Sequence, residues 1–356
     1  MTEKKWMDDP KVVANAIYWK FIEGYSFPKV TNELENLGYN TTGNSVESRF
    51  KSWGLTNKFN PKLVEKSFDE LYEKINRKLG ISKIDIKPPS KSKSNIKTHL
   101  VGTDPHCPFY REDMAFYLIK TYGKGSKTPV DSLILGGDIF DCYSFSRFLK
   151  TKNFPMIDEF QKGIAYVTML AEHFPEIIIV KGNHDDRVFK FFSGAVGIEA
   201  TLGFVNYDWI KHVCNLLPNV FQATNTIGDE NNGEHELCHY HILGKDCAVC
   251  HFEFSGGANV ILKASQKVEQ WSYIWRKYLP ELSECNLYLQ GHCHSVGKST
   301  IHGGLKTVGE TGHMAQIQEY AVRADSKYTP GVNAYWIVKQ ENGETIINDS
   351  NYHIYN

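Results

Sequence analysis

The sequence predicts an α/β fold preceded by a small all-α domain. After residue 98, short apolar runs bounded by turn residues alternate with longer amphipathic stretches, which is typical of βαβ units. Residues 1–80 instead repeat their apolar side chains every three to four positions, as helices do. Residues 81–97 are rich in serine, lysine and proline. We therefore expect a helical domain at 1–80, a flexible linker at 81–97 and an α/β domain at 98–356.

The first domain is expected to hold a series of helices, at residues 12–23, 27–37, 45–53 and 61–80. Ser26 is suited to cap the second helix, Pro28 fits its first turn, and Gly38 ends it. The first three helices, the third carrying Arg49 and Lys51, resemble a nucleic-acid-binding helix-turn-helix module. The alternative is a plain helical bundle used for packing or dimerisation, because the turn from Gly38 is longer than the compact motif prefers.

Charge is distributed unevenly along the chain. Residues 1–98 hold 18 Lys+Arg against 12 Asp+Glu, a net of +6, and the remainder holds 22 against 29, a net of −7. A basic first segment on an acidic body favours a polyanionic partner for the front of the chain.

Several protein classes are disfavoured. No apolar run approaches the roughly 20 residues that cross a bilayer, so we expect no membrane partner. The first residues lack the apolar core of a secretory signal, and a cytoplasmic location is the default. The eight cysteines are then expected to be free thiols. Cys247-Ala-Val-Cys250-His251 spells a c-type haem attachment site, but that interpretation requires an exported protein.

Within the α/β domain, strands are expected near residues 99–103, 132–135, 177–180, 248–250 and 287–289. Helices are expected near 112–120 and 156–172. The segment from about residue 196 to 239 has no clear pattern, and we expect it to cover or border the site.

A polar cluster follows each of these five apolar runs: Asp104-Pro-His106, Gly137-Asp138-Ile-Phe-Asp141, Gly182-Asn183-His184-Asp185, His251, and Gly291-His292-Cys-His294. In open α/β sheets, ligands bind outside the carboxyl ends of the strands. We therefore expect these clusters to share one crevice. The glycines before Asp138, Asn183 and His292 permit sharp turns and close approach of the backbone.

Seven of these side chains carry donors that bind transition metals. Two aspartates, one asparagine and four histidines favour Mn, Fe or Zn over Ca or an isolated Mg. Seven ligands exceed what one tetrahedral ion needs and suit two ions about 3.5–4 Å apart, bridged by a carboxylate and a water. Such a pair lowers the pKa of the bridging water and screens the charge of a phosphate, which points to phosphoester hydrolysis.

The order DxH, GDxxD, GNH(D/E), H, GHxH resembles the calcineurin-like metallophosphoesterases, and Gly182-Asn-His-Asp-Asp-Arg187 resembles their bacterial and phage-type members. The resemblance covers about residues 98–340. It implies a four-layer αββα sandwich of two mixed sheets and a metal-dependent phosphoric ester hydrolase, located in the host cytoplasm if phage-encoded. It also implies two divalent ions, with Mn²⁺ favoured and Fe, Zn, Ni or Mg as alternatives.

The resemblance also implies a role for each residue of the motifs. One metal would be held by Asp104, His106 and His294, the other by Asn183, His251 and His292, and Asp138 would bridge both. His184 would act as general acid, oriented by Asp141. The implied mechanism is in-line attack of metal-bound hydroxide on phosphorus, without a covalent enzyme intermediate.

Three points stay open at the level of sequence. His239 and His241 compete with His251 for the fourth motif. Arg187 is a candidate to bind a substrate phosphate through its guanidinium, against the alternative of a structural salt bridge. His302 and His313, which follow the last motif, are candidates for substrate contact.

The sequence leads to two functional hypotheses. The first is a phosphodiesterase or nuclease that acts on DNA or another nucleic acid, with the basic helical domain positioning the substrate. The alternative is a phosphatase or phosphodiesterase that acts on a nucleotide or phosphoprotein, with the first domain used for assembly. A catalytically silent scaffold is a third reading, which the complete set of ligands together with His184 disfavours. The oligomeric state is not predicted.

Overall fold

The computed structural model describes residues 6–8, 12, 15–16, 19, 25–52, 86–87, 94–146, 155–188, 190, 209–229, 233–253, 263–316 and 331–356. The chain divides into two compact units. One joins residues 1–84 with 142–161 and 186–212, and the other contains 85–141, 162–185 and 213–356. All seven predicted metal ligands belong to the second unit. The predicted domain boundaries at residues 80 and 97 stay a prediction.

Two of the predicted N-terminal helices are present, α2 (Phe27–Asn36) and α3 (Gly43–Ser52). Ser26 caps α2, because its hydroxyl accepts a hydrogen bond from the Lys29 amide, and Pro28 lies in the first turn as expected. The helix α3 begins two residues earlier than predicted, since the Thr42 side chain accepts a hydrogen bond from an amide in its first turn. The helices predicted at 12–23 and 61–80 lie largely or entirely outside the described residues.

The larger sheet has the strand order β13-β12-β1-β2-β3-β4, and β14 also pairs with β12. Strands β1 to β4 run parallel, whereas β12 is antiparallel to β1, with Val101 opposite Trp336. The sheet is therefore mixed. Its strands are β1 (Ile96–Gly102), β2 (Ser132–Gly136), β3 (Ile177–Val180), β4 (Val220–Gln222), β12 (Ala334–Glu341), β13 (Glu344–Thr345) and β14 (Asn351–Ile354).

A second mixed sheet has the strand order β10-β11-β9-β8-β7. Its three central strands are parallel and its two edge strands are antiparallel to their neighbours. The strands are β7 (Tyr240–Leu243), β8 (Cys247–Cys250), β9 (Leu287–Gln290), β10 (Val296–Ile301) and β11 (Lys306–Thr311). A separate two-stranded ribbon consists of β5 (Asn225–Asp229) and β6 (Gly233–Leu237).

The two sheets pack face to face through one apolar core. It includes Val101, Ile134 and Val180 from the larger sheet and Val249 and Leu289 from the smaller one. Burying each of these side chains contributes roughly 1.5–3 kcal/mol to folding before the entropy cost. The docked sheets therefore form a stable base for the loops at the strand ends.

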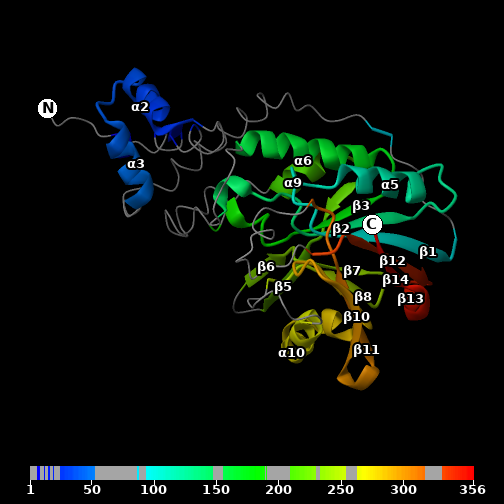
Figure 1. The fold of residues 1–356 in the computed structure, drawn as a ribbon. Coiled ribbons are helices and arrows are strands. Elements are labelled where there is room, and N and C mark those ends of the chain that lie inside the picture. Colours follow the sequence, from blue (N-terminus) through cyan, green and yellow to red (C-terminus); the bar gives the residue numbers. More distant parts are fainter. Residues whose placement is uncertain are drawn as a thin grey trace. The chain divides into compact units, whose positions relative to one another are not determined.

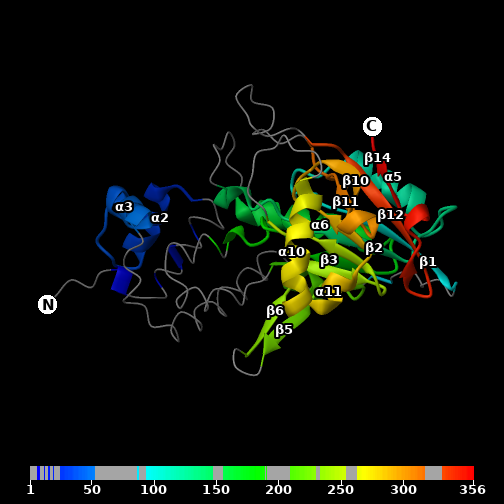
Figure 2. The same cartoon turned by 90° about the horizontal axis from the view of Figure 1, so that it is seen from below.

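Helices cover the two outer faces. Figure 1 shows α5 (Glu112–Tyr122), together with the part of α6 (Met156–Ala171) that belongs to the same unit, over the larger sheet. Figure 2 shows α10 (Lys263–Tyr278) and α11 (Pro280–Glu284) over the smaller sheet, where Trp275 and Leu282 pack on Tyr288. The result is the α/β sandwich of four layers and two mixed sheets that the sequence predicts.

The predicted strands agree with the structure to within a few residues. The run Ile177–Val180 is predicted without error, because a strand in the middle of a parallel sheet is apolar on both faces. In the segment that had no clear pattern, the described residues form α9 (Trp209–Leu216), β4, β5 and β6. Among the described residues, no helix is both long and apolar enough to span a bilayer.

Candidate metal centre

The polar clusters stand directly after strands of both sheets. Asp104, Asp138 and Asn183 follow β1, β2 and β3 of the larger sheet. His251 follows β8 and His292 follows β9 of the smaller sheet. The carboxyl ends of these parallel strands lie at one end of the sandwich, so two sheets deliver donors to a common place.

The backbone of the predicted ligands is unusual. Eight of the described non-glycine residues have a positive φ angle, and five of these are predicted ligands. Such angles are uncommon for L-residues and cluster at functional sites, where each costs roughly 1–3 kcal/mol. The five are Asp104 (φ 54°), His106 (49°), Asp138 (51°), His292 (75°) and His294 (57°). The two sheets hold these residues in conformations that an isolated loop would rarely adopt.

Two glycines make the close approach possible, as the sequence suggested. Gly137 has φ 97°, and a Cβ atom there would overlap the imidazole ring of His251. A Cβ atom on Gly182 would overlap the backbone and carboxylate of Asp138. Any larger residue at either position would push two predicted ligands apart.

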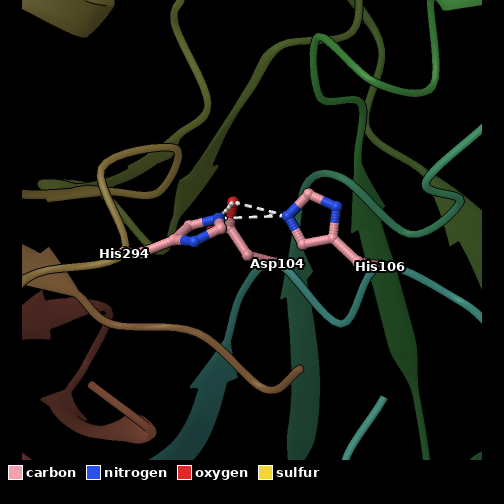
Figure 3. A group of neighbouring side chains, drawn as sticks. All are labelled: Asp104, His106 and His294. Atoms are coloured by element: carbon pink, nitrogen blue, oxygen red, sulfur yellow. Dashed lines mark hydrogen bonds and ion pairs between the residues drawn. The ribbon is translucent and has the colours of Figure 1, made fainter. Parts of the chain in front are cut away.

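The first group of donors consists of Asp104, His106 and His294 (Figure 3). Oδ1 of Asp104 lies 3.2 Å from Nε2 of His294 and 3.7 Å from Nε2 of His106. The two Nε2 atoms are 3.0 Å apart, and their rings point toward the same carboxylate oxygen. Three donors that converge in this way surround a position suited to one cation.

The second group of donors consists of Asn183, His251 and His292. Oδ1 of Asn183 lies 2.7 Å from Nδ1 of His292. His251 donates a hydrogen bond from Nδ1 to the carbonyl of Gly136 at 2.7 Å, so the lone pair of a neutral ring is on Nε2. This buried Nε2 atom makes no well-aligned hydrogen bond within the described part of the chain and lies 3.3 Å from Oδ2 of Asp138. An unpartnered buried imidazole nitrogen is a group that a metal ion would satisfy.

Asp138 lies between the two groups. Its Oδ2 is 3.3 Å from Nε2 of His251 and 3.9 Å from Nε2 of His106, one residue from each group. Its Oδ1 accepts a hydrogen bond from the His184 amide at 2.7 Å, which fixes the carboxylate. Asp138 therefore lies within reach of both groups of donors.

The electrostatic field of the centre favours cations. Burial would raise the pKa of Asp104 and of Asp138, but nearby histidines outweigh it and hold both pKa values well below the usual range. Burial lowers the pKa of His106 and of His251, yet the aspartates raise the net pKa to about 10 and about 9. Within the described residues, neither Asp104 nor Asp138 pairs with a lysine or arginine. Buried carboxylates with mixed N and O donors around them fit divalent metal ions.

His184 and Asp141 form a pair beside the donors. Nδ1 of His184 lies 2.9 Å from Oδ1 of Asp141. Nε2 of the same ring lies 3.7 Å from Oδ2 of Asp138, so it faces the centre. Burial alone would raise the pKa of Asp141. The hydrogen bonds and charges of His106 and His184 lower it by more, so the net pKa lies well below the usual range. Asp141 is therefore an anion that accepts a hydrogen bond from His184.

Comparison with known proteins gives similarities among solved structures only. No model of a protein family matches the chain, and no curated protein matches it. A metallophosphoesterase from Sphaerobacter thermophilus is 13% identical over 73% of this chain and 88% of its own, with a TM-score of 0.33. A Streptococcus pneumoniae protein described as a predicted phosphoesterase is 12% identical, over 73% and 98%, with a TM-score of 0.26. Vps29 of Entamoeba histolytica in complex with zinc is 12% identical, over 73% and 99%, with a TM-score of 0.29.

In its α/β sandwich and in the order of its motifs, the chain resembles the metallophosphoesterases. The roles of individual side chains follow from the motifs and from the distances above.

Asp185 is the last residue of the Gly182-Asn183-His184-Asp185 cluster, and the sequence assigned it no role. Its carboxylate accepts hydrogen bonds from the amides of Gly182 (2.8 Å), Phe140 (2.9 Å) and Ile139 (3.3 Å). It thereby ties the loop after β3 to the loop after β2. Burial, followed by repulsion from Asp138, raises the pKa of Asp185 to about 7. Its place as fourth residue of the GNHD motif was the only signal in the sequence.

The remaining candidates lie in different surroundings. Arg187 is partly buried three residues after His184, and its role in substrate binding stays a prediction. Of the competing histidines, His251 is the one whose ring lies against Asp138. The backbone carbonyl of His239 accepts a hydrogen bond from the amide of His251. His302 pairs with Ser272 of α10 at 2.8 Å.

The two cysteines of the haem-like motif are separated by the strand that carries them. They stand three residues apart on β8, so their side chains point to opposite faces. Cys250 is buried in the core under α10, and Cys247 is buried between the sheets. One haem cannot reach both thiols.

Proposed function

We propose that this protein is a phosphoesterase that depends on two divalent metal ions. The observation that carries the proposal is the position of Asp138 between two groups of nitrogen and oxygen donors that come from five segments of two sheets. One ion would be held by Asp104, His106 and His294, the other by Asn183, His251 and His292, with Asp138 shared. When bound, the ions would supply an activated water and neutralise the charge of the phosphate.

The protein's own side chains supply proton transfer. Asp141 keeps a proton on Nδ1 of His184 and stabilises the imidazolium form, because the carboxylate is an anion within hydrogen-bond distance. Nε2 of His184 faces the centre and would protonate the leaving oxygen. Asp141 also accepts a hydrogen bond from Nδ1 of His106, which leaves the lone pair of Nε2 for a metal.

For the metal we propose Mn²⁺, with Fe, Zn, Ni or Mg as alternatives. Four imidazoles in the predicted ligand set argue against Ca²⁺, which prefers oxygen donors. The test is metal analysis of protein purified without chelator, followed by reconstitution of chelated protein with each metal. Two equivalents per chain support the dinuclear centre, and one or none would contradict it.

The substrate we propose is a nucleic-acid phosphodiester. Support comes from the +6 net charge of residues 1–98, which suits a polyanion. In this proposal the helix-turn-helix-like segment around α2 and α3 binds nucleic acid, and the protein acts in the cytoplasm. A phosphatase or diesterase for a nucleotide or phosphoprotein is the alternative outcome of the test below.

Activity is tested first with bis-p-nitrophenyl phosphate in the presence of Mn²⁺ and with chelator. Turnover that requires metal, and that is absent in Asp138→Asn, supports the phosphoesterase. Single-stranded DNA, duplex DNA, RNA, cyclic nucleotides and a phosphopeptide are then compared. Preference for a cyclic nucleotide or phosphopeptide would overturn the nucleic-acid substrate and leave the phosphoesterase intact.

The basic front segment is tested in the full chain. Arg49→Gln combined with Lys51→Gln removes two positive charges from α3. If this helix binds nucleic acid, the variant should lose affinity for DNA and show a weaker dependence of binding on salt. Hydrolysis of bis-p-nitrophenyl phosphate should be unchanged. Equal DNA binding by both proteins would argue for the assembly role.

A further inference from the structure

A buried histidine that is not a predicted ligand lies flat against one that is. The rings of His294 and His313 are stacked, with centroids 4.9 Å apart and an angle of 27° between their planes. His313 is only 3% exposed and follows β11 of the smaller sheet. One face of the His294 ring is therefore covered by an aromatic ring, while its Nε2 atom points to Asp104.

The backbone around this stack is interlocked. The amide of Val332 donates to the carbonyl of His294 at 2.8 Å, and the amide of His313 donates to the carbonyl of Val332 at 3.0 Å. Gly331 has φ 79°, and a Cβ atom there would stand 2.7 Å from Cβ of His294 and 2.8 Å from Cδ2 of His313. The segment before β12 thus holds both histidines at a fixed separation.

Asn333 fixes the loop that carries His313. Its Nδ2 atom donates to the carbonyls of Ala315 at 2.8 Å and His313 at 3.1 Å, and its Oδ1 atom accepts from Nη1 of Arg111 at 2.9 Å. Nδ1 of His313 accepts from the amide of Ala315 at 3.3 Å, which sets the ring orientation. The carbonyl of Asn333 accepts from the amide of Tyr355 at 2.8 Å.

The contacts that hold Asn333 extend to Tyr355, the residue after β14. The guanidinium of Arg111 pairs with the carboxylate of Asp113, with Nε 3.1 Å from Oδ1. The same guanidinium lies over the ring of Tyr355, 4.7 Å from its centroid. The orientation of Asn333, and through it of His313, is therefore fixed from two sides.

We propose that His313 is a positioning residue for His294. By stacking on that ring, and by being held through Asn333, it fixes the direction of Nε2 of His294 and so sets the affinity of the metal position formed by Asp104, His106 and His294. It does so without touching the metal. The effect is confined to this position, because the stack involves none of the residues of the second group. The inference rests on the proposed function, since it concerns one of the two proposed metal positions.

The contact has a physical reason to matter. His294 has a left-handed backbone conformation, φ 57°, which is costly and persists only where surrounding contacts hold it. Residues that orient a metal ligand without binding the metal typically change metal affinity by about 10–100-fold when they are lost. Because the two rings stack face to face, His313 can orient the His294 ring without competing for the lone pair of its Nε2 atom.

The experiment is a calorimetric titration of Mn²⁺ into full-length protein that chelator has made metal-free. The absorption spectrum of the Co²⁺ form is a second readout. His313→Leu fills the space without a ring, and His313→Phe keeps the stack. We expect the leucine variant to weaken one of two binding steps by about 10–100-fold and to leave the other within about twofold. The phenylalanine variant should restore most of that affinity. The Co²⁺ spectrum should change in the leucine variant only.

Asn333→Ala is a second test variant, because it removes the side chain that holds the His313 loop and leaves both imidazoles in place. It should weaken the same step. His302→Ala is the matched control, since His302 follows the neighbouring strand β10 and pairs with Ser272 of α10. It should change neither step.

Two results would overturn the inference while leaving the proposed function intact: both steps unchanged in His313→Leu, or a phenylalanine variant as weak as the leucine variant. A wild-type chain that binds no metal would overturn both. A loss of both steps in equal measure in folded His313→Leu would show a general structural effect and would also contradict the inference.

Discussion

Oδ1 of Asp141 lies 2.9 Å from Nδ1 of His184, and the same oxygen lies 3.0 Å from Nδ1 of His106. One carboxylate oxygen thus orients the proposed general acid and a proposed metal ligand together. The sequence predicted the first of these contacts and not the second. Both rings present Nε2 toward Asp138, at 3.7 Å for His184 and 3.9 Å for His106.

This shared oxygen predicts a double effect for Asp141→Asn. The amide keeps the size of the side chain but removes the negative charge that stabilises protonated His184 and orients His106. We expect kcat to fall by roughly 10²–10⁴-fold and metal affinity by roughly 10–100-fold. Steady-state kinetics with an alkyl phosphodiester, whose basic leaving group needs a general acid, and a separate metal titration resolve the two effects. A loss in only one of them would mean that Asp141 serves only one imidazole.

His184→Ala should keep its metal content and lose rate. General acid catalysis typically contributes about 10²–10⁴-fold, and the contribution grows as the leaving group becomes more basic. We therefore expect a small loss for a p-nitrophenyl ester and a large loss for an alkyl ester of the same phosphate. An equal loss for both esters would remove His184 from the role of general acid, and full activity would remove it from the mechanism.

Gly137→Ala should disrupt the centre, and Gly125→Ala is its matched control. Both glycines have left-handed backbone angles, φ 97° and 82°, so alanine strains either by about 1–2 kcal/mol. Only at Gly137 would the new Cβ atom overlap the ring of His251, whereas Gly125 has no atom within 4 Å. Urea denaturation should show that the backbone strain lowers the free energy of unfolding by a similar amount in both variants. Gly137→Ala should lose additional free energy of unfolding because of the overlap with His251. Metal binding should fail only in the Gly137 variant, and retained binding there would contradict the close approach.

His99 predicts a pH dependence of stability outside the metal centre. Burial lowers its pKa from 6.5 to about 4, against Asp131 and Glu176, which raise it. Because the folded pKa is below the unfolded one, the stabilisation is complete above pH 6.5 and is lost as the pH falls toward 4. The difference corresponds to about 3 kcal/mol. The chelated protein should therefore lose stability over this window.

The control for His99 is His99→Gln, which cannot titrate and can still bond Ser132, now 2.8 Å from Nδ1 of His99. Urea denaturation of both proteins at several pH values between 4 and 7.5 gives the two slopes. The free energy of unfolding should fall less steeply in the variant. Parallel slopes would mean that His99 titrates normally.

The fold and the gathering of the donors were predictable because they depend on strand ends. Apolar runs such as Ile177–Val180 mark buried parallel strands, and whatever follows such a strand is delivered to one end of the sheet. The same logic favours His251 over His239 and His241, which the sequence left as alternatives, because β8 ends at Cys250. Spacing along the chain was enough for these residues.

The supporting contacts were not predictable, because they depend on loop conformation. Asp185 accepts from three amides and Asp141 contacts His106 because of how the loops fold, and the loops after β1 and β2 turn through left-handed residues. His313 stacks on His294, and Val332 is hydrogen-bonded to the backbone of both histidines. No periodicity in the sequence encodes such contacts, and the sequence marked His313 only as a candidate for substrate contact.

The donors of the centre are divided between two sheets, and this division has a kinetic consequence. The amide of His292 donates to Asp104 across 188 residues of sequence, so the centre is complete only after the sheets have docked. A metal ion held by donors of both sheets would contribute nothing to folding before the sheets dock. It would oppose the separation of the two sheets during unfolding. Added metal should therefore lengthen the lifetime of the native state and leave the rate of refolding unchanged.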